Sequence, residues 1–346
     1  MNGHARQSGA LLIARDTAVF LILVLSAVVL YRLDPKLLTS SSGASSSSGT
    51  VVLQAEATVP PAASAAAAST ANEQSAASFA VATEAPAAST PEPTAVPTAT
   101  GDFSTVFPQT DTGAGALLSY QTNDVRIAVT TAQQYSATYY IADVWVRTID
   151  SFHTAFAGGQ YGLGIHDMPA NVAVQNGAAL AVTGDYYGAR DKGVVIRNGE
   201  LYRDVMGDDM CLLRTDGTLS VFQKGSFSAL TDMGSTAWQA WAFGPALVDN
   251  GAACDTSASS IRKKNPRCAI GYYEPGHYCF IVVDGRQTGY SEGMTLDELA
   301  SVFVQLGCQT AYNLDGGATA TMVFNGEVVN RPAGGGRESS DIIYFS

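Results

Sequence analysis

Three segments of this sequence place an aspartate beside glycine at the end of an apolar run. They are Gly184-Asp185, Asp284-Gly285 and Asp315-Gly316-Gly317. Glycine lets backbone N–H groups approach a ligand closely, and a strand end holds the neighbouring carboxylate in place. Two such carboxylates can do coupled acid/base work or share a cation, and an adjacent arginine can bind an anion. Because an isolated Asp-Gly-Gly is also typical of a tight turn, the surrounding elements must decide between these interpretations.

A strand, a helix and a second strand position two of these aspartates. The helix starts at the capping box Thr295-Leu-Asp-Glu298 and stops at Gly307, between strands that end at Asp284 and Asp315. Such a crossover makes the two strands parallel in one sheet and brings their carboxyl ends to one edge. We therefore expect Asp284 and Asp315 to converge there, with strand axes about 4.8 Å apart if the strands are neighbours. The alternative is that each aspartate only orders its own loop.

Residues 102–346 alternate apolar residues with turn signals and are numerous enough for one large domain. Within them, Asp167-Met168-Pro169 predicts the start of a short helix with the aspartate as its cap. Asn198-Gly199 and Asp216-Gly217 are strong signals for two hairpins. The predicted fold class is α+β: one strand-rich domain with a mixed sheet, several hairpins and a C-terminal βαβ crossover.

The first hundred residues divide into a basic end, an apolar run and a linker. Residues 1–16 carry Arg6 and Arg15, and residues 17–33 are mainly apolar but few for a membrane helix, which usually needs about 20. No A-x-A cleavage site follows, so we predict an uncleaved transmembrane signal anchor behind a cytoplasmic tail; a cleaved signal peptide is the alternative. Residues 34–101, rich in Ser, Ala, Thr and Pro, are predicted to be a disordered linker. The pattern is typical of a single-pass protein of the cell membrane with an extracytoplasmic C-terminal domain.

The charge and the cysteines argue against several classes of function. A formal net charge of −12, with no basic cluster longer than Arg262-Lys263-Lys264, argues against binding to nucleic acid. The five cysteines show no C-x-x-C spacing, which gives a zinc site little support. Cys254 and Cys268 bracket a polar loop and are the first pair to test for a disulfide, with buried reduced cysteines as the alternative. No G-x-S-x-G motif accompanies the histidines, so a serine hydrolase is weakly supported.

Taken in order, several motifs of the chain resemble those of the phosphodiester glycosidase family. They are Gly184-Asp185-Tyr186-Tyr187-Gly188, Phe243-Gly-Pro-Ala-Leu, Asn265-Pro-Arg267 with Ala269-Ile-Gly271, Val283-Asp-Gly-Arg286 and Asn313-Leu-Asp-Gly-Gly317. The resemblance covers residues 125–346 and implies hydrolysis of sugar 1-phosphodiesters such as GlcNAc-1-phosphodiesters. It also implies a role in envelope glycan or exopolysaccharide metabolism, as for membrane-anchored bacterial members of the family.

The same resemblance implies roles for individual residues. Asp315 would be the nucleophile or general base, with Asp284 and Asp185 as supporting carboxylates. Because the leaving group is a stable phosphate monoester, arginine clamps on the phosphate matter more than protonation of the leaving group. The implied substrate-binding residues are Arg267, Arg286, Arg337, Gly316, Gly317, Thr319, Thr321, Tyr186 and Arg190. No cofactor and no metal ligand are predicted, although a divalent cation between Asp284 and Asp315 is left open.

Two departures from the family's motifs lead to a competing function. Ala318 stands where the family usually has a third glycine, and Thr183 stands where it usually has an asparagine. The first adds a Cβ where the backbone would approach the phosphate, and the second removes an amide. The alternative is therefore a non-catalytic glycan- or phosphate-binding module of the cell envelope, and a purely structural envelope protein is a third, weaker hypothesis.

Overall fold

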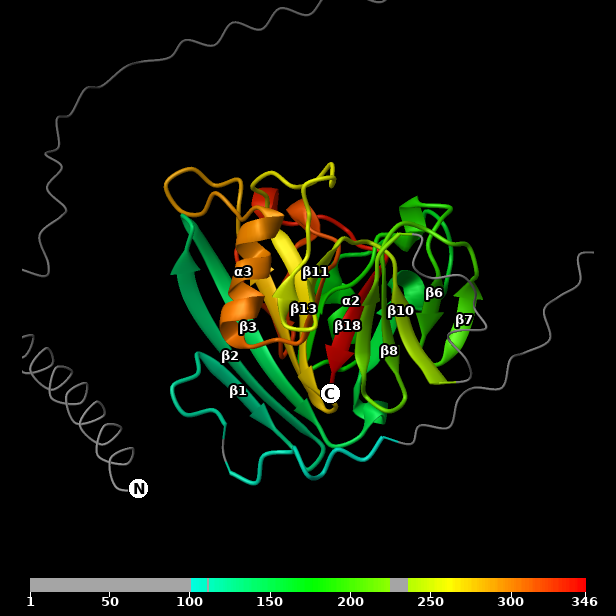
Figure 1. Ribbon diagram of the computed structural model, residues 1–346. Helices are drawn as coiled ribbons and strands as arrows, with labels where there is room; N and C mark the ends of the chain where they lie inside the picture. The colour runs from blue at the N-terminus through cyan, green and yellow to red at the C-terminus, as the bar shows by residue number, and fades with distance from the viewer. Residues whose placement is uncertain (1–100, 111, 225–235) are drawn as a thin grey trace, which may run out of the picture. The chain divides into compact units, whose positions relative to one another are not determined.

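The computed structural model describes residues 101–110, 112–224 and 236–346. The predicted tail, signal anchor and nearly all of the linker lie outside the described residues. Within the described ranges, no helix is long and apolar enough to cross a membrane. These ranges contain three β-sheets and two α-helices (Figure 1), so the predicted strand-rich α+β class is confirmed.

The largest sheet in this part of the chain combines early and late strands in the order β1-β2-β3-β14-β13-β15-β11-β12. Its strands are β1 (Leu118–Gln121), β2 (Val125–Gln134), β3 (Ala137–Val146), β11 (Ala246–Asp249), β12 (Ala252–Ala253), β13 (Arg267–Glu274), β14 (His277–Val283) and β15 (Thr310–Asn313). Neighbouring strands are antiparallel throughout. Because β14 and β15 both pair with β13, they run parallel to each other with β13 between them. The predicted crossover is confirmed in direction, but its two strands are not neighbours.

Two five-stranded sheets complete the described fold. Their orders are β7-β6-β10-β8-β9 and β17-β16-β5-β18-β4. Their strands are β4 (His153–Phe156), β5 (Leu180–Thr183), β6 (Val195–Arg197), β7 (Glu200–Arg203), β8 (Met210–Arg214), β9 (Leu219–Phe222), β10 (Ala237–Trp241), β16 (Met322–Phe324), β17 (Glu327–Val328) and β18 (Asp341–Phe345). Both predicted hairpins are confirmed. Asn198 and Gly199, with φ of 52° and 82°, turn β6 into β7, as a tight hairpin turn requires.

The two helices follow their local sequence signals. In α3 (Leu296–Leu306) the Thr295 hydroxyl accepts from the Glu298 N–H at 3.1 Å, and the Glu298 carboxylate accepts from the Thr295 N–H at 2.8 Å. Gly307 ends α3 with a φ of 84°, so the predicted capping box and stop are confirmed. Helix α2 (Pro169–Gln175) begins one residue later than predicted, because Met168 is the N-cap. Asp167 precedes that cap and accepts from the Met168 N–H at 2.7 Å.

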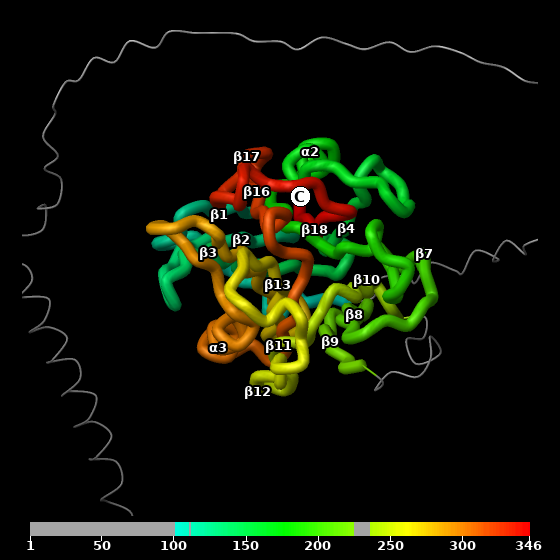
Figure 2. Tube along the Cα trace, turned by 90° about the horizontal axis from the view of Figure 1, so that it is seen from above, coloured from blue at the N-terminus to red at the C-terminus, as the bar shows by residue number. Residues whose placement is uncertain are grey.

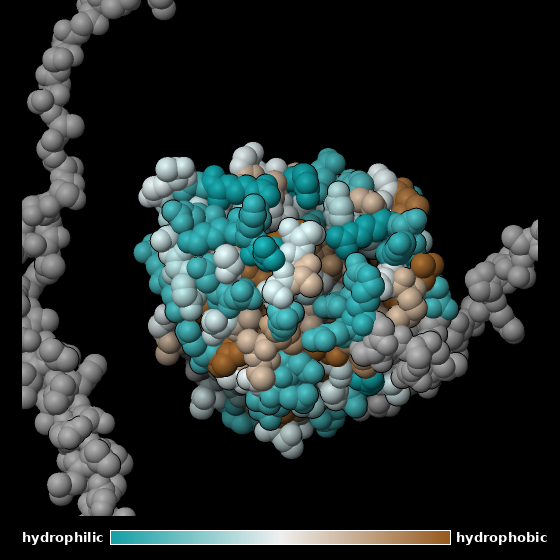
Figure 3. Space-filling model, turned by 45° about the horizontal axis from the view of Figure 1, so that its top comes forward, coloured by the Kyte–Doolittle hydropathy of each residue, from teal (hydrophilic) through white to brown (hydrophobic). Residues whose placement is uncertain are grey.

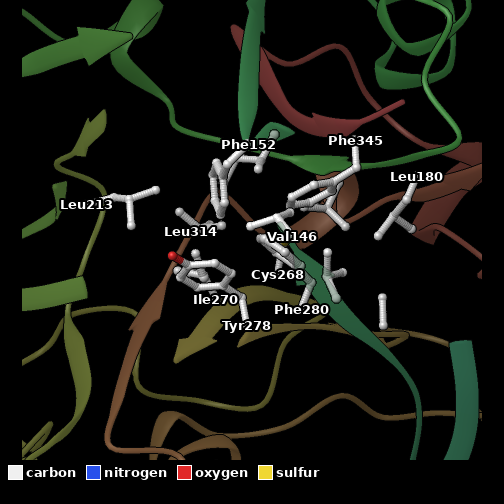
Figure 4. Close-up of a cluster of buried hydrophobic side chains, with 14 of the residues drawn as sticks. Val146, Phe152, Leu180, Leu213, Cys268, Ile270, Tyr278, Phe280, Leu314 and Phe345 are labelled. Carbon is white, nitrogen blue, oxygen red and sulfur yellow. The ribbon is translucent and has the colours of Figure 1, made fainter. Parts of the chain in front are cut away.

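The hydrophobic core lies where the three sheets face one another. Figure 4 shows Val146, Phe280 and Leu314 from the largest sheet or its connections packed with Leu213 and Phe345 from the other two. Seen from above, the three sheets surround this common centre (Figure 2). A second apolar cluster fills the space between α3 and the largest sheet. Burial of this apolar surface fixes how the sheets, and hence the loops at their ends, lie relative to one another.

All five cysteines lie in the described residues and none forms a disulfide. The Cys268 thiol is buried and donates to the Thr183 carbonyl at 3.2 Å, whereas Cys254 is only partly buried. No disulfide joins Cys254 and Cys268, the first pair to test, and the alternative of buried reduced cysteines holds for Cys211, Cys268, Cys279 and Cys308. The two sulfurs that approach each other belong to Cys279 and Cys308, 3.6 Å apart.

Candidate active site

Loops from the three sheets meet beside Asp315, immediately after β15. The Asp315 N–H donates to the Gly184 carbonyl at 2.9 Å, which joins the loop after β15 to the loop after β5. The Asp185 N–H donates to Oδ1 of Asp341, the first residue of β18, at 2.6 Å. After β10, the Ala242 N–H donates to Asp185 Oδ2 at 2.8 Å. The loop before β18 lies at the upper edge in Figure 1, and the face seen from that side is mainly hydrophilic (Figure 3).

Asp315 is only 3% exposed, and its Oδ2 atom has no hydrogen-bond partner among the described residues. Burial raises the pKa of this carboxyl to about 7; the Thr319 hydroxyl and the Arg337 guanidinium oppose the rise, and Asp185 adds to it. A carboxyl whose pKa lies near neutral can act as a base in its ionised form at ordinary pH. A buried polar atom left unpaired costs stability and is a common mark of a functional site.

Asp185 belongs to a buried group of three charged side chains that also contains Arg197 and Asp341. Arg197 Nε donates to Asp341 Oδ2 at 2.7 Å, and Arg197 Nη2 lies 3.6 Å from Asp185 Oδ2. The three side chains are at most 2% exposed. Burial raises the pKa of the Asp341 carboxyl to about 6 although Arg197 opposes the shift. Arg197 comes from β6 and Asp341 from β18, so this group also ties two sheets together under the site.

The sequence-based prediction missed Arg197 and Asp341. Each had a detectable signal: Arg197 ends the apolar run Val194–Ile196, and Asp341 begins the apolar strand Ile342–Phe345. A charged side chain inside a buried strand needs a charged or hydrogen-bonding partner. Sequence alone, however, does not show that one arginine and two aspartates, far apart in the chain, form ion pairs with one another.

Asp284 does not join Asp315, which corrects the predicted convergence. One strand, β13, separates β14 from β15, so the two strand axes lie about 10 Å apart rather than about 5 Å. The Asp284 carboxylate accepts hydrogen bonds from the Tyr290 hydroxyl at 2.8 Å, the Asn330 amide at 2.9 Å and the Arg331 N–H at 2.9 Å. Asp284 therefore orders the loop after β17.

A cation shared by Asp284 and Asp315 was expected only if their strands were neighbours, and β13 lies between those strands. Within residues 101–110, 112–224 and 236–346, no group of three or more His, Cys, Asp or Glu residues has the arrangement to hold a metal ion.

Arg337 and Arg190 flank the Tyr186 ring. Their guanidinium carbons lie 5.7 and 5.6 Å from the ring centroid, within cation–π range. Arg190 also lies over the Phe243 ring at 4.7 Å. Arg337 is exposed and lowers the pKa of Asp315, so it is near enough to that carboxylate for electrostatic contact. The structure thus brings Arg337, Tyr186 and Arg190 together, with Arg337 in electrostatic range of Asp315.

Arg286 lies beside Gly317, in the glycine loop that follows Asp315. It has a φ of 58°, donates through Nε and Nη2 to Asn265 Oδ1, and its Nη2 would lie 3.1 Å from a Cβ built on Gly317. Its side chain is exposed and therefore accessible to an anion.

Arg267 is buried, unlike the exposed Arg286 and Arg337. It is 3% exposed and donates to the carbonyls of Met294 at 3.0 Å and Ile261 at 2.7 Å and also to that of Lys263. Its donors hold the loop before β13 and the segment before α3, and its buried side chain is less accessible to an anion than the exposed arginines.

The glycine loop after Asp315 tolerates the alanine at position 318. The residue of this loop with a positive φ is Gly317, at 68°, and Ala318 has an ordinary backbone conformation. Gly316 is required for space, since a Cβ there would lie 2.9 Å from the Pro266 carbonyl. The methyl group of Ala318 therefore needs no backbone strain.

The hydroxyls of two threonines, Thr183 and Thr319, hold this loop by hydrogen bonds. The Thr183 hydroxyl donates to the Thr319 carbonyl at 2.5 Å and accepts from the Thr321 N–H at 3.2 Å. The Thr319 hydroxyl donates to the Gly316 carbonyl at 2.7 Å. Thr319 and Thr321 are both buried. The Thr319 hydroxyl holds the loop, whereas the Thr321 hydroxyl has no hydrogen-bond partner among the described residues. Thr183, which stands where the family usually has an asparagine, also holds this loop through its hydroxyl.

Comparison with known proteins agrees with this geometry. A family model described as phosphodiester glycosidase matches residues 173–346, which contain all the site residues described above. The chain belongs to the phosphodiester glycosidase family. The matched region begins within α2 and leaves out β1 to β4, so it is shorter than the resemblance at residues 125–346.

The relatives show how far the likeness extends. The SPbeta prophage-derived uncharacterized protein YomE of Bacillus subtilis (strain 168) is 32% identical over 151 residues, which are 41% of this chain and 23% of that protein. The shared region is thus about a quarter of that longer relative.

Two solved structures show the fold of this glycosidase-family domain. One is the catalytic domain of zebrafish N-acetylglucosamine-1-phosphodiester alpha-N-acetylglucosaminidase, auto-inhibited by its pro-peptide, with a TM-score of 0.52 and 21% identity over 65% of this chain and 85% of that chain. The other is a hypothetical protein from Synechocystis, with a TM-score of 0.51 and 12% identity over 64% of this chain and 62% of that chain.

Proposed function

We propose that this domain is a hydrolase that cleaves sugar 1-phosphodiesters, with GlcNAc-1-phosphodiesters as the first substrates to test. The observation that carries the proposal is the buried Asp315 carboxylate, which keeps one oxygen without a hydrogen-bond partner among the described residues. Two exposed arginines lie near its loop, since Arg337 lowers the pKa of Asp315 and Arg286 lies beside Gly317. Membership of the phosphodiester glycosidase family supports it. A carboxylate to act at an anomeric carbon and guanidinium groups to hold a phosphate are the two requirements of this reaction.

In this mechanism Arg286 and Arg337 bind the phosphate and orient the sugar so that its anomeric carbon faces Asp315. The bond between that carbon and the phosphate oxygen breaks, and the phosphate departs as a monoester while water supplies the new hydroxyl. Asp315 acts either as nucleophile or as the base that deprotonates the water. Because the leaving phosphate is stable as an anion, no buried acid has to protonate it, and the arginines neutralise its developing charge.

A direct experiment is to assay residues 102–346 against a panel of α- and β-linked sugar 1-phosphodiesters, GlcNAc-1-phosphomethyl included. Release of free sugar, followed by NMR from the first turnover, reports both activity and the anomer formed. Retention of configuration assigns Asp315 as nucleophile and inversion assigns it as base. Asp315→Asn is the inactive control, and turnover by that variant at the wild-type rate would remove Asp315 from catalysis.

The competing function is a non-catalytic glycan- or phosphate-binding module, suggested by Ala318 and Thr183. The hydrogen bonds of Thr183 weaken the second ground, whereas the ordinary backbone at Ala318 shows only that its methyl group causes no strain. Binding of envelope polysaccharide without turnover of any phosphodiester in the panel would favour this module over the hydrolase.

We further propose that the enzyme works outside the cytoplasm, tethered to the cell membrane through residues 17–33 and displayed on the linker of residues 34–101, where it acts in envelope glycan or exopolysaccharide metabolism. The length and composition of these two segments support this part of the proposal. Protease added to intact cells should remove the domain and leave a short membrane fragment, and full protection of the domain would contradict the tethered, outward placement.

A further inference from the structure

Two cysteine thiols are in contact in the apolar layer between α3 and the largest sheet. Cys279 lies on β14 and Cys308 lies between α3 and β15, and their sulfurs are 3.6 Å apart. Both residues are at most 1% exposed. They belong to the apolar cluster that packs α3 (orange in Figure 1) against the sheet. Neither thiol takes part in the proposed hydrolysis, so their contact calls for another explanation.

Packing alone would explain a single buried cysteine, which often acts as a small apolar side chain. Cys211 on β8 fits that role, because it is fully buried in the central core. Cys279 and Cys308 differ from Cys211, since their sulfurs meet although the two residues are 29 positions apart in the chain. Disulfide sulfurs lie about 2.05 Å apart, so from 3.6 Å the two sulfurs need to approach by about 1.5 Å.

A glycine beside Cys279 gives its sulfur room. Gly271 on β13 pairs with Cys279 on β14. A Cβ built on Gly271 would lie 2.7 Å from the Cys279 sulfur, so the sulfur occupies space that a larger residue would fill. Cys308 follows Gly307, which ends α3, so its side chain lies outside the helical turns. Rotation about the Cα–Cβ bonds of the two cysteines can therefore bring the sulfurs together.

A bond between these sulfurs would tie together the crossover that supports Asp315. The enclosed segment contains the loop after β14 and the whole of α3. Directly after Cys308, the Gln309 N–H donates to the Tyr272 carbonyl of β13 at 2.8 Å and so leads the chain into β15. Asp315 follows β15. The bond would thus link the entry to β15 with β14, across β13, and would restrict the unfolded chain.

We propose that Cys279 and Cys308 are a disulfide site, closed while the domain folds in an oxidising environment. The proposal is independent of the proposed function, because no step of the hydrolysis uses either sulfur. The oxidant is itself a disulfide, either of a small thiol such as glutathione or of a thiol–disulfide oxidoreductase.

The exchange takes place in two displacements. The thiolate of one cysteine attacks the disulfide of the oxidant, forms a mixed disulfide and releases the first thiol of the oxidant. The thiolate of the other cysteine then attacks the sulfur of its partner and releases the second thiol. The cysteine pair gives up two electrons and two protons, and the oxidant is reduced to two thiols.

Burial decides when this exchange takes place. Burial raises the pKa of the Cys279 thiol, and the neighbouring Cys308 thiol adds to the rise. Because the thiolate is the reactive form, the pair reacts slowly once α3 has packed over it. The bond therefore forms before α3 covers the sulfurs and is afterwards protected from external thiols, as a structural cross-link is.

The test starts from the full chain, unfolded in urea with dithiothreitol and refolded in detergent with either a glutathione redox buffer or dithiothreitol. Free thiols are then alkylated, and mass spectrometry of unreduced peptides maps the bonds. With glutathione, the peptide of Cys279 should be linked to that of Cys308, and the Tm should exceed that of the reduced protein by about 5–10 °C. Alkylation of both thiols in the folded, glutathione-treated protein would show that they only pack, and would overturn the proposal.

Three alanine variants show whether the shift in Tm belongs to this pair. Cys279→Ala and Cys308→Ala each remove one sulfur, so each should lose the difference in Tm between the two refolding conditions, and either is sufficient if the other does not fold. Cys211→Ala is the matched control, because it removes a buried thiol elsewhere and should keep the difference. A difference that persists in Cys279→Ala or Cys308→Ala would assign the stabilisation to another bond and reject the site. These measurements need no substrate, so failure of the proposed hydrolase would leave them unaffected.

Discussion

Asp315 and Asp284 follow equivalent strand ends and both precede glycine, yet their carboxylates have different surroundings. Asp284 accepts from Tyr290, Asn330 and Arg331, and so both of its oxygens are engaged by the protein. Asp315 keeps one buried oxygen without a partner in the described part of the chain. The comparison teaches that the Asp-Gly pattern marks a constrained strand end, whereas hydrogen-bond satisfaction distinguishes an aspartate that holds a loop from one available for chemistry.

The largest expected effect concerns Asp315. Asp315→Asn keeps the shape of the side chain but removes the ionised oxygen, so kcat on a sugar 1-phosphodiester should fall about 10³–10⁴-fold. Stability near neutral pH should not fall, because an unpaired buried carboxylate is a cost to the folded state. Steady-state kinetics and thermal unfolding measure the two quantities. A variant that is unstable but fully active would place Asp315 in the same class as Asp284.

The second effect concerns the ion-pair group beneath Asp185. Arg197→Met leaves Asp185 and Asp341 buried without their shared cation, which should lower the free energy of unfolding by about 3–5 kcal/mol. Adding Asp341→Asn should recover part of the loss, and urea denaturation of the single and double variants completes the cycle. Strictly additive losses would show that the two side chains do not act together.

Asp284→Asn tests the other side of the comparison with a smaller effect. The amide has one accepting oxygen instead of two, so the loop at Asn330 and Arg331 should loosen at a cost of about 1–3 kcal/mol. The kcat of the folded variant should stay within a few-fold of the wild-type value. Loss of kcat as large as that of Asp315→Asn, without loss of stability, would restore Asp284 to the catalytic group.

The pH dependence gives the finest test. The folded-state pKa of Asp315, about 7, lies above the unfolded value near 4, so the folded state binds the additional proton between these values. Stability should therefore decrease as pH rises from about 4 to about 7, and Asp315→Asn should flatten that slope. Activity should change in the opposite sense: kcat should rise about tenfold per pH unit below about 7 and level off above it, because only the ionised carboxylate acts. A kcat that declines above pH 7 would assign Asp315 as an acid.

Local signals in the sequence predicted local structure well. The capping box at Thr295, the stop at Gly307 and the turn at Asn198-Gly199 depend on residues within a few positions of one another, and all three are confirmed. The strand Ala237–Trp241 gave a weaker signal, because it is buried on both faces and lacks a polar alternation. The family was also predictable, since its motifs are short and occur in order.

The sequence by itself determined which strand ends carry aspartate and glycine, how the helices begin and end, and the family to which the chain belongs. Only the tertiary structure decided which aspartates meet, because a third strand, β13, pairs between β14 and β15 and the loop after β5 reaches Asp315 instead. The physical reason is that strand order depends on how apolar faces pack over the whole domain. The same packing makes Arg267 a support for a loop and brings Arg197 and Asp341 together beneath the site.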